Sequence, residues 1–182
     1  MTYGRILAGV TAAAVALGGG VALAAAPKST TIKQSTSFAF KPNRYIQDGL
    51  RWNKDVYHVR SGGTLHLKFT VKDEGQHTFT VLRKSQIPTT PETLFNCKAC
   101  NRMIRAHGAD PTDESKPPTF AYVQNGKGQN TPPKIDGPGD SAGIGFPGQP
   151  KTVDLKVTAR KGTTLHFLCL VHPWMQATLK VG

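Results

Sequence analysis

Short stretches of alternating hydrophobic and polar residues recur along this chain. In residues 64–71, for example, Leu65, Leu67 and Phe69 lie two positions apart with polar residues between the two leucines. A period of two puts successive side chains on opposite faces of a β-strand, so such a stretch predicts a half-buried strand. Similar stretches are residues 36–40, 56–60, 77–83, 152–158, 163–169 and 175–181. Because turn signals such as Ser61-Gly62-Gly63 separate several of them, the pattern predicts an all-β sandwich.

A long interruption at about residues 85–150 separates the stretch at 77–83 from the one at 152–158. Its first half predicts a helix, with Thr89 as N-cap, Glu92 in the position that completes a capping box and Gly108 as the stop. Its second half is rich in proline and glycine and predicts a loop, with a short strand at 120–124 before the Asn125-Gly126 turn. We therefore expect the sandwich to carry a long helix-plus-loop insertion.

The first residues have the composition of a secretory signal peptide. After Arg5 comes an uncharged run dominated by Ala, Gly, Val and Leu, and Ala22-Leu23-Ala24 matches an A-x-A cleavage signal. The sequence thus predicts a signal peptide at 1–24, a polar tether at 25–35 and one domain at 36–182. Export places the domain in the periplasm or outside the cell. The alternative is a membrane tether formed by an uncleaved signal, because the run is about long enough to span a bilayer.

Near the C-terminus, Cys169, His172 and Met175 place a thiol, an imidazole and a thioether within one short turn. Copper that cycles between two oxidation states favours a trigonal plane of one Cys sulfur and two His nitrogens, with a long axial bond to Met sulfur. The turn supplies three of these four ligands, so a second His has to come from elsewhere. His77, at the start of an alternating stretch, is the best candidate.

With these residues the chain resembles the blue copper proteins, or cupredoxins, and among them the amicyanin-like or plastocyanin-like group. A C-x2-H-P-x-M loop follows an aromatic-rich strand there, as Cys169 to Met175 does here, and an upstream His completes the site. The resemblance implies a Greek-key sandwich, one type 1 copper and transfer of single electrons. It also implies that His172, next to Trp174, is the electron port. Trp174 could instead simply cover the end of the core.

Two further cysteines, Cys97 and Cys100, lie in the predicted helix on one stripe with His107. With Cys169 as a copper ligand, these two can pair with each other, and we expect a local disulfide. A second metal site with His107 or Met103, or a redox-active cysteine pair, are the alternatives. Haem attachment is excluded because no His follows Cys100.

The chain is strongly basic, with 23 Lys and Arg against 11 Asp and Glu and a net charge of +12. Export and the scattered placement of the basic residues argue against nucleic acid as partner. We expect a monomer that meets a redox protein with an acidic docking surface. The few carboxylates lie mainly in loops, and a closed set of four ligands lacks the open position of a catalytic metal, so we expect no enzyme. The alternatives are a copper-handling protein, as carrier or scavenger, and a stress or adhesion module with a cupredoxin fold.

Overall fold

The structure is a computed structural model of the 182-residue chain. It describes residues 25–69, 75–113, 115–147 and 149–182, so the predicted signal peptide at 1–24 lies outside the described residues. Within these ranges, no helix is long and apolar enough to cross a membrane.

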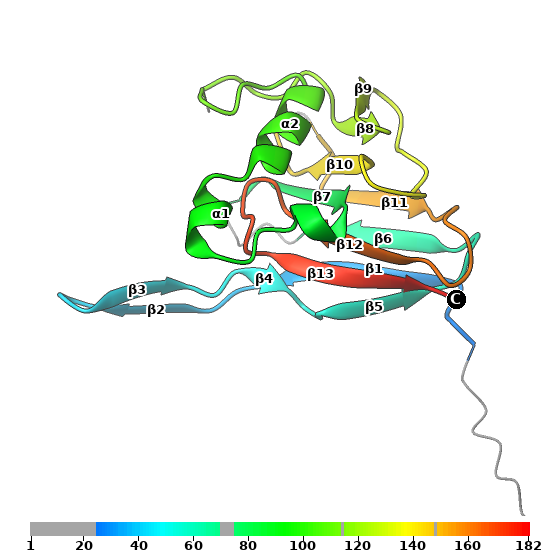
Figure 1. The fold of residues 1–182 in the computed structure, drawn as a ribbon, viewed down its shortest axis with the longest axis horizontal. Helices are drawn as coiled ribbons and strands as arrows, with labels where there is room; N and C mark the ends of the chain where they lie inside the picture. The colour runs from blue at the N-terminus through cyan, green and yellow to red at the C-terminus, as the bar shows by residue number, and fades with distance from the viewer. Residues whose placement is uncertain (1–24, 70–74, 114, 148) are drawn as a thin grey trace, which may run out of the picture.

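Two sheets form the sandwich (Figure 1). The first contains, in spatial order, β11 (Thr152–Lys156), β6 (Thr64–Lys68), β1 (Ser29–Ser35) and β4 (Arg51–Trp52). The second contains β5 (Val56–Val59), β13 (Gln176–Val181), β12 (Thr164–Leu168), β7 (His77–Leu82), β10 (Ser141–Ile144), β8 (Tyr122–Gln124) and β9 (Lys127–Gln129). Consecutive strands such as β6 and β7, or β11 and β12, lie in different sheets. The prediction of an all-β Greek-key sandwich with a helix-plus-loop insertion is confirmed.

The core lies between the two sheets and comes from the alternating positions of their strands. Leu65 and Leu67 of β6 face the same buried cluster as Phe79 of β7 and Phe167 of β12. His66, between the two leucines, points outward and forms an ion pair with Asp154 at 2.7 Å. The period of two thus separates core from surface as the sequence predicts.

The N-terminal segment corrects one prediction. Ser29–Ser35 is β1, a strand that pairs in parallel with β6, with Ile32 opposite Leu67. The expectation of a loose polar tether at 25–35 is therefore wrong for these seven residues. Ile32 is the residue of this strand that is fully buried, so main-chain pairing rather than a hydrophobic pattern places the segment in the sheet.

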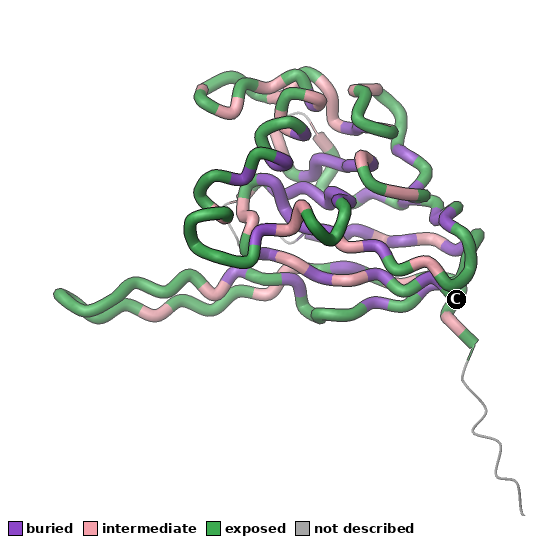
Figure 2. Tube along the Cα trace, viewed as in Figure 1, coloured by how far each residue is buried: buried purple, intermediate pink, exposed green. Residues whose placement is uncertain are grey.

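A hairpin of two strands projects from the sandwich as an arm (Figure 1). It consists of β2 (Phe38–Lys41) and β3 (Tyr45–Asp48), which pair with each other in a separate sheet. The strand predicted at 36–40 therefore exists in part, as β2, but it does not belong to the sandwich. Figure 2 shows the arm exposed almost throughout, whereas buried residues recur along the sandwich strands.

The insertion begins with a 3-10 turn (Lys84–Gln86) and two helices, α1 (Pro91–Phe95) and α2 (Lys98–Ala106). One continuous helix from an N-cap at Thr89 was the wrong prediction. The N-cap of α1 is Thr90, whose side chain accepts from the N–H of Thr93, and Cys97 interrupts the helix as the N-cap of α2. α2 ends at Ala106, and Gly108, the predicted stop, follows its C-cap His107 with φ of +74°.

The second half of the insertion extends the sandwich. The strand predicted at 120–124 is present as β8, and it forms a hairpin with β9 through Asn125-Gly126, both with positive φ. β10, which the sequence pattern did not predict, pairs with β7 on one side and β8 on the other. The insertion is therefore continuous with the sheet in which His77 begins β7 and Cys169 follows β12.

Candidate metal centre

His77, Cys169 and His172 meet where β7 begins and β12 ends. Nδ1 of His77 and Nδ1 of His172 each lie 3.7 Å from Cys169 Sγ, and the ligand atoms of all three residues lie within 4.8 Å of one another. Bonds of about 2.0 and 2.3 Å, usual for nitrogen and sulfur ligands of Zn²⁺, put N and S about 3.7 Å apart when they meet at about 120°. The trigonal plane that copper favours has this angle. The three side chains are therefore compatible with one copper ion.

The three side chains come from positions of limited freedom. His77 is the first residue of β7, is fully buried, and stacks on Phe69 with ring centroids 5.0 Å apart. Cys169 follows β12 directly and is also fully buried. His172 is half-buried, and its ring lies 5.0 Å from that of His77. Strand ends and ring stacking thus hold the donors before any metal arrives.

Met175 closes the loop that begins at Cys169. The N–H of Cys169 donates to the carbonyl of Met175 at 3.1 Å, and the N–H of Met175 donates to the carbonyl of His172 at 2.8 Å. Trp52 Nε1 donates to the same Met175 carbonyl at 2.9 Å. Met175 is fully buried in the core cluster that also contains Cys169. Cys169, His172 and Met175 thus belong to one hydrogen-bonded turn, of which Cys169 and Met175 are fully buried.

Burial sets the protonation states of this region. It raises the pKa of the Cys169 thiol, although the N–H of Thr78, 3.3 Å from Sγ, acts in the opposite direction. It lowers the pKa of His172, against a smaller effect of the Asp48 carboxylate. Burial therefore favours the protonated thiol of Cys169 and the neutral ring of His172, and a metal ion that binds Sγ has to displace the thiol proton.

Trp174 lies against His172, the predicted electron port. Their rings meet edge to face with centroids 5.3 Å apart. Trp174 Nε1 donates to the carbonyl of Leu50 at 3.0 Å, while 40% of the side chain stays exposed. Val171 is 45% exposed beside it. Two exposed apolar residues, Val171 and Trp174, therefore lie next to His172 in the loop.

Cys97 and Cys100 form a disulfide, which confirms the first of the three expectations for them. Both are buried in a second cluster with Leu82, Leu168 and Leu170, next to the end of β12. The alternative of a second metal site with His107 or Met103 loses both of its thiols to this bond.

Two residues at the site carry no signal in the sequence pattern. Thr78 donates its N–H to Cys169 Sγ, and its Oγ1 accepts from the N–H of Leu170 at 2.7 Å. Gly75 lies so close to the ligands that a Cβ there would be 3.2 Å from Nε2 of His77. Both contacts depend on how distant segments meet, which spacing along the chain does not show.

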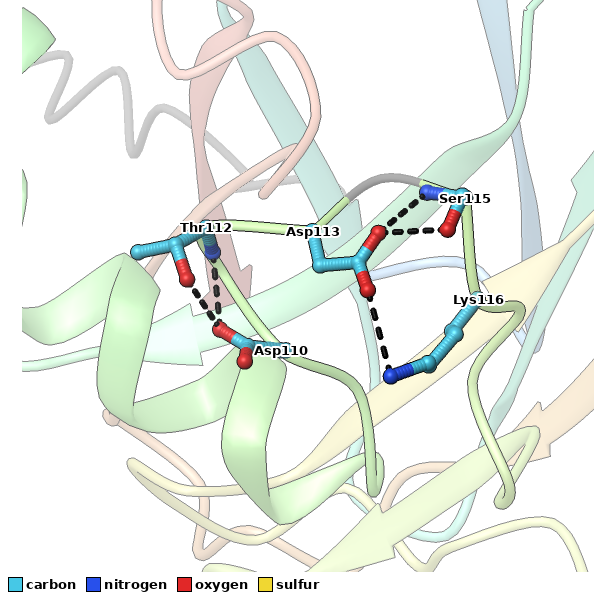
Figure 3. Close-up of polar contacts among 5 residues, drawn as sticks. All are labelled: Asp110, Thr112, Asp113, Ser115 and Lys116. Atoms are coloured by element: carbon cyan, nitrogen blue, oxygen red, sulfur yellow. Dashed lines mark hydrogen bonds and ion pairs between the residues drawn. The ribbon is translucent and has the colours of Figure 1, made fainter.

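A groove of about 460 Å³ opens between the insertion and residues 169–175, which we call the copper loop. Leu170 and Val171 form part of its wall. Carboxylates at its rim are bonded within their own loop, as Figure 3 shows. Asp110 accepts from the N–H and hydroxyl of Thr112, and Asp113 accepts from Ser115 and pairs with Lys116 at 3.2 Å. These hydrogen bonds lower the pKa of both exposed carboxyls.

No protein-family model and no curated protein sequence matches the chain. Among solved structures, the chain is similar to a dithionite-reduced auracyanin from Roseiflexus castenholzii, with 14% identity and a TM-score of 0.42 over 87% of this chain and 99% of the other. Auracyanin A, a blue copper protein from Chloroflexus aurantiacus, aligns with 18% identity and a TM-score of 0.41 over 86% and 99%. Rusticyanin from Thiobacillus ferrooxidans aligns with 13% identity and a TM-score of 0.35, over 85% of this chain and 78% of rusticyanin. Such low values carry no assignment, so the assignment depends on the geometry of the site.

Proposed function

We propose that this chain is a mononuclear type 1 copper protein that carries single electrons between redox partners. The observation that carries the proposal is the position of two imidazole nitrogens, each 3.7 Å from the sulfur of the buried Cys169. His77, Cys169 and His172 would hold the ion, with Met175 as the fourth ligand. When bound, the copper ion supplies a one-electron redox couple.

The protein's own contribution is to keep these donors in place. His77 is held by the β7 ladder and by Phe69, and Cys169 and Met175 are held by hydrogen bonds across the loop. Donors fixed in this way change little between oxidation states, and a small reorganisation favours fast electron transfer. Four protein ligands would leave no open coordination position, so we propose a carrier and no enzyme.

Copper handling is the weaker candidate. A carrier or scavenger of copper would benefit from secondary thiols, but Cys97 and Cys100 are joined to each other and are buried. The donor set around Cys169 instead serves two oxidation states of one ion. We therefore favour electron transfer over storage or delivery of the metal.

For the docking surface we propose Trp174, Val171 and the arm formed by β2 and β3. Residues directly opposite each other share a face of a hairpin, so Phe38, Phe40 and Ile46 lie on one face, with exposures of 69%, 63% and 70%, and Asp48 lies opposite Phe38 at its base. The arm also carries two cations beside its turn, Lys41 and Arg44. An apolar face flanked by positive charge fits a redox protein whose docking patch is apolar and rimmed by carboxylates.

The arm is joined to the predicted electron port at its base. Leu50, which follows β3, accepts from Trp174 Nε1, and its own N–H donates to the Asp48 carboxylate. A partner seated on the arm would therefore lie next to His172. We further propose that the protein acts outside the cytoplasm, because residues 1–24 have the composition of a secretory signal. We also propose that it acts as a monomer.

The test is the metal content and colour of the purified protein after loading with copper. We expect one copper per chain and an intense thiolate-to-copper absorption band that disappears in Cys169→Ser. A variant with both Cys97→Ala and Cys100→Ala is the matched control, since it removes the other two cysteines, and it should keep the band. A colourless loaded protein, or a band that survives in Cys169→Ser, would refute the proposal.

A further inference from the structure

A chain of buried polar side chains connects the insertion with the predicted copper loop. His107 Nε2 lies 2.8 Å from Ser141 Oγ, which lies 2.7 Å from Thr80 Oγ1. Thr80 Oγ1 lies 3.1 Å from Thr78 Oγ1, and Thr78 Oγ1 accepts from the N–H of Leu170 at 2.7 Å. The chain therefore begins on a helix cap of the insertion and ends on the residue after the predicted sulfur ligand.

The two sides of β7 explain why these hydroxyls are buried. Phe79 and Val81 face the main core, whereas Thr78 and Thr80 alternate with them on the other face. The insertion covers that other face, because Leu82 of β7 packs there with Cys100 and Met103 of α2. β10, beside β7 in the sheet, puts Ser141 opposite Thr80. A buried hydroxyl without a partner is destabilising, so a covered row of this kind is stable only when its hydrogen bonds are made.

Thr78 joins this chain to the sulfur. Its side chain receives the N–H of Leu170, while its backbone N–H donates to Cys169 Sγ at 3.3 Å. Hydrogen bonds to a ligating sulfur tune the redox potential of a copper site. A group that orients Thr78 therefore affects both the hydrogen bond to Cys169 Sγ and the hydrogen bond that holds Leu170.

The protonation state of His107 decides the direction of these hydrogen bonds, because each hydroxyl has one proton to donate. Its Nδ1 must donate, because its partner at 2.8 Å is the carbonyl of Phe120. Thr80 has one proton for two acceptors, Ser141 Oγ and Thr78 Oγ1. A neutral ring accepts a hydrogen bond at Nε2 from the Ser141 hydroxyl. The oxygen of Ser141 then accepts from Thr80. A protonated ring donates to Ser141, which then donates to Thr80 and leaves the Thr80 proton for Thr78.

The charged groups near His107 have other partners. Asp110, Asp113 and Lys116 line the same groove but are bonded within their loop, and Asp140, next to Ser141, accepts from backbone N–H groups of residues 125, 136 and 137. Arg102 and Arg105 on α2 are exposed. Burial is the main influence on the ring, and it lowers the pKa of His107.

We propose that His107 is a positioning residue for the predicted copper thiolate, because it determines whether Thr80 donates its proton to Ser141 or to Thr78. The influence on copper rests on the proposed function. The influence on Thr78 and on the N–H of Leu170 is a property of the protein chain and exists without metal. The insertion thus contributes to the site although none of its residues is a predicted ligand.

The test breaks the chain at two separate links and measures its far end. His107→Phe removes the ring nitrogens, and Thr80→Val removes one hydroxyl, whereas Thr80→Ser keeps it. The matched control is Thr178→Val, because Thr178 Oγ1 lies 3.5 Å from Nδ1 of His166 in the same sheet but outside this chain. The first readout is hydrogen exchange of the Leu170 amide in metal-free protein, and the second is the reduction potential of the copper-loaded protein.

We expect the Leu170 amide to exchange at least about threefold faster in Thr80→Val, since Thr78 loses the side chain that orients it. His107→Phe removes the acceptor of the Ser141 hydroxyl, so Ser141 can donate to Thr80 and Thr80 to Thr78, and exchange should be slower there than in the unmodified protein. The potential should fall in Thr80→Val and not in His107→Phe, because a sulfur with weaker hydrogen bonds favours Cu(II). The variant that carries both substitutions should behave as Thr80→Val alone does. Thr80→Ser and Thr178→Val should behave as the unmodified protein does.

Unchanged exchange in Thr80→Val, or full additivity in the double variant, would overturn the inference. If His107→Phe does not fold, Ser141→Ala breaks the next link and decides in its place. A protein that binds no copper would refute the proposed function, but the exchange measurement would still decide on the chain. If copper binds and exchange changes while the potential does not, the chain orders the loop without tuning the metal, which also refutes the role proposed for His107.

Discussion

Two tryptophans hold the copper loop by the same kind of hydrogen bond in different surroundings. Trp52 donates to the carbonyl of Met175 at 2.9 Å and is 2% exposed, while Trp174 donates to the carbonyl of Leu50 at 3.0 Å and is 40% exposed. Trp52 also packs against Phe69 and Phe167. Loss of the Trp52 bond removes one of two donors to the buried Met175 carbonyl, and water does not reach this carbonyl to replace it, so the two tryptophan bonds differ in what their removal costs.

We predict that Trp52→Phe lowers the free energy of unfolding by about 2 kcal/mol, as the sum of a lost buried hydrogen bond and a small cavity. Trp174→Phe should cost less than about 1 kcal/mol, since water can replace its bond. Urea unfolding of both variants measures the difference. Equal losses would show that the Trp52 bond does not hold Met175 as described.

Local spacing was enough to predict most of the site but not its surroundings. Cys169, His172 and Met175 lie within seven residues, so any short loop brings them close, and His77 was suggested by its strand edge. The structure brings the three nitrogen and sulfur donors together, although copper binding itself stays a prediction. The contacts of Thr78 depend on the register of β7, which a local pattern does not contain.

Single elements show where the period of two fails as a signal. All four residues of β10, Ser141–Ile144, are buried, because the strand lies between β7 and β8 and is covered on both faces. Such a strand does not alternate between apolar and polar residues. β1 fails in the opposite way, since it is almost wholly polar and is placed by pairing with β6. Both were missed for the same reason: their partners lie far away in the sequence.

The break between α1 and α2 has a local cause that the sequence contained. The side chain of Cys97 accepts from the N–H of Cys100 at the start of α2, and the same two residues are joined by the disulfide. A disulfide across three residues closes a short loop and leaves the N-terminal turn of α2 little freedom. The spacing predicted the bond, but its effect on the helix was not recognised.

We predict that Cys97→Ala with Cys100→Ala lowers the free energy of unfolding by about 1–2 kcal/mol, the entropic value for so short a loop. The copper band and the copper content should stay unchanged. Thermal unfolding and metal analysis of the loaded variant measure both. Loss of a metal equivalent would mean that these cysteines bind metal after all.

On the scale of the whole molecule, charge and shape act at different distances. The net charge of +12 attracts an acidic partner from any direction, whereas the arm and the apolar surface at Trp174 lie at the end of the sandwich that holds the copper loop. Long-range attraction is screened by salt, with a Debye length of about 30 Å at 0.01 M and about 8 Å at physiological ionic strength. Charges close to the port should therefore matter most once salt is present.

This can be tested with hexacyanoferrate, an anionic one-electron reagent, without knowledge of the natural partner. Two variants each remove two positive charges, Lys41→Gln with Arg44→Gln in the arm, and Arg160→Gln with Lys161→Gln in the turn before β12, at the opposite end of the strand from Cys169. Both lower the net charge equally, so a difference between them reports position alone. We predict a severalfold slower second-order rate for the arm variant, a weaker dependence of that rate on salt, and a smaller effect of the distal variant, measured by stopped-flow absorbance of the copper band. Equal effects would mean that the arm does not guide anions to His172, and that only the total charge of the molecule brings them in.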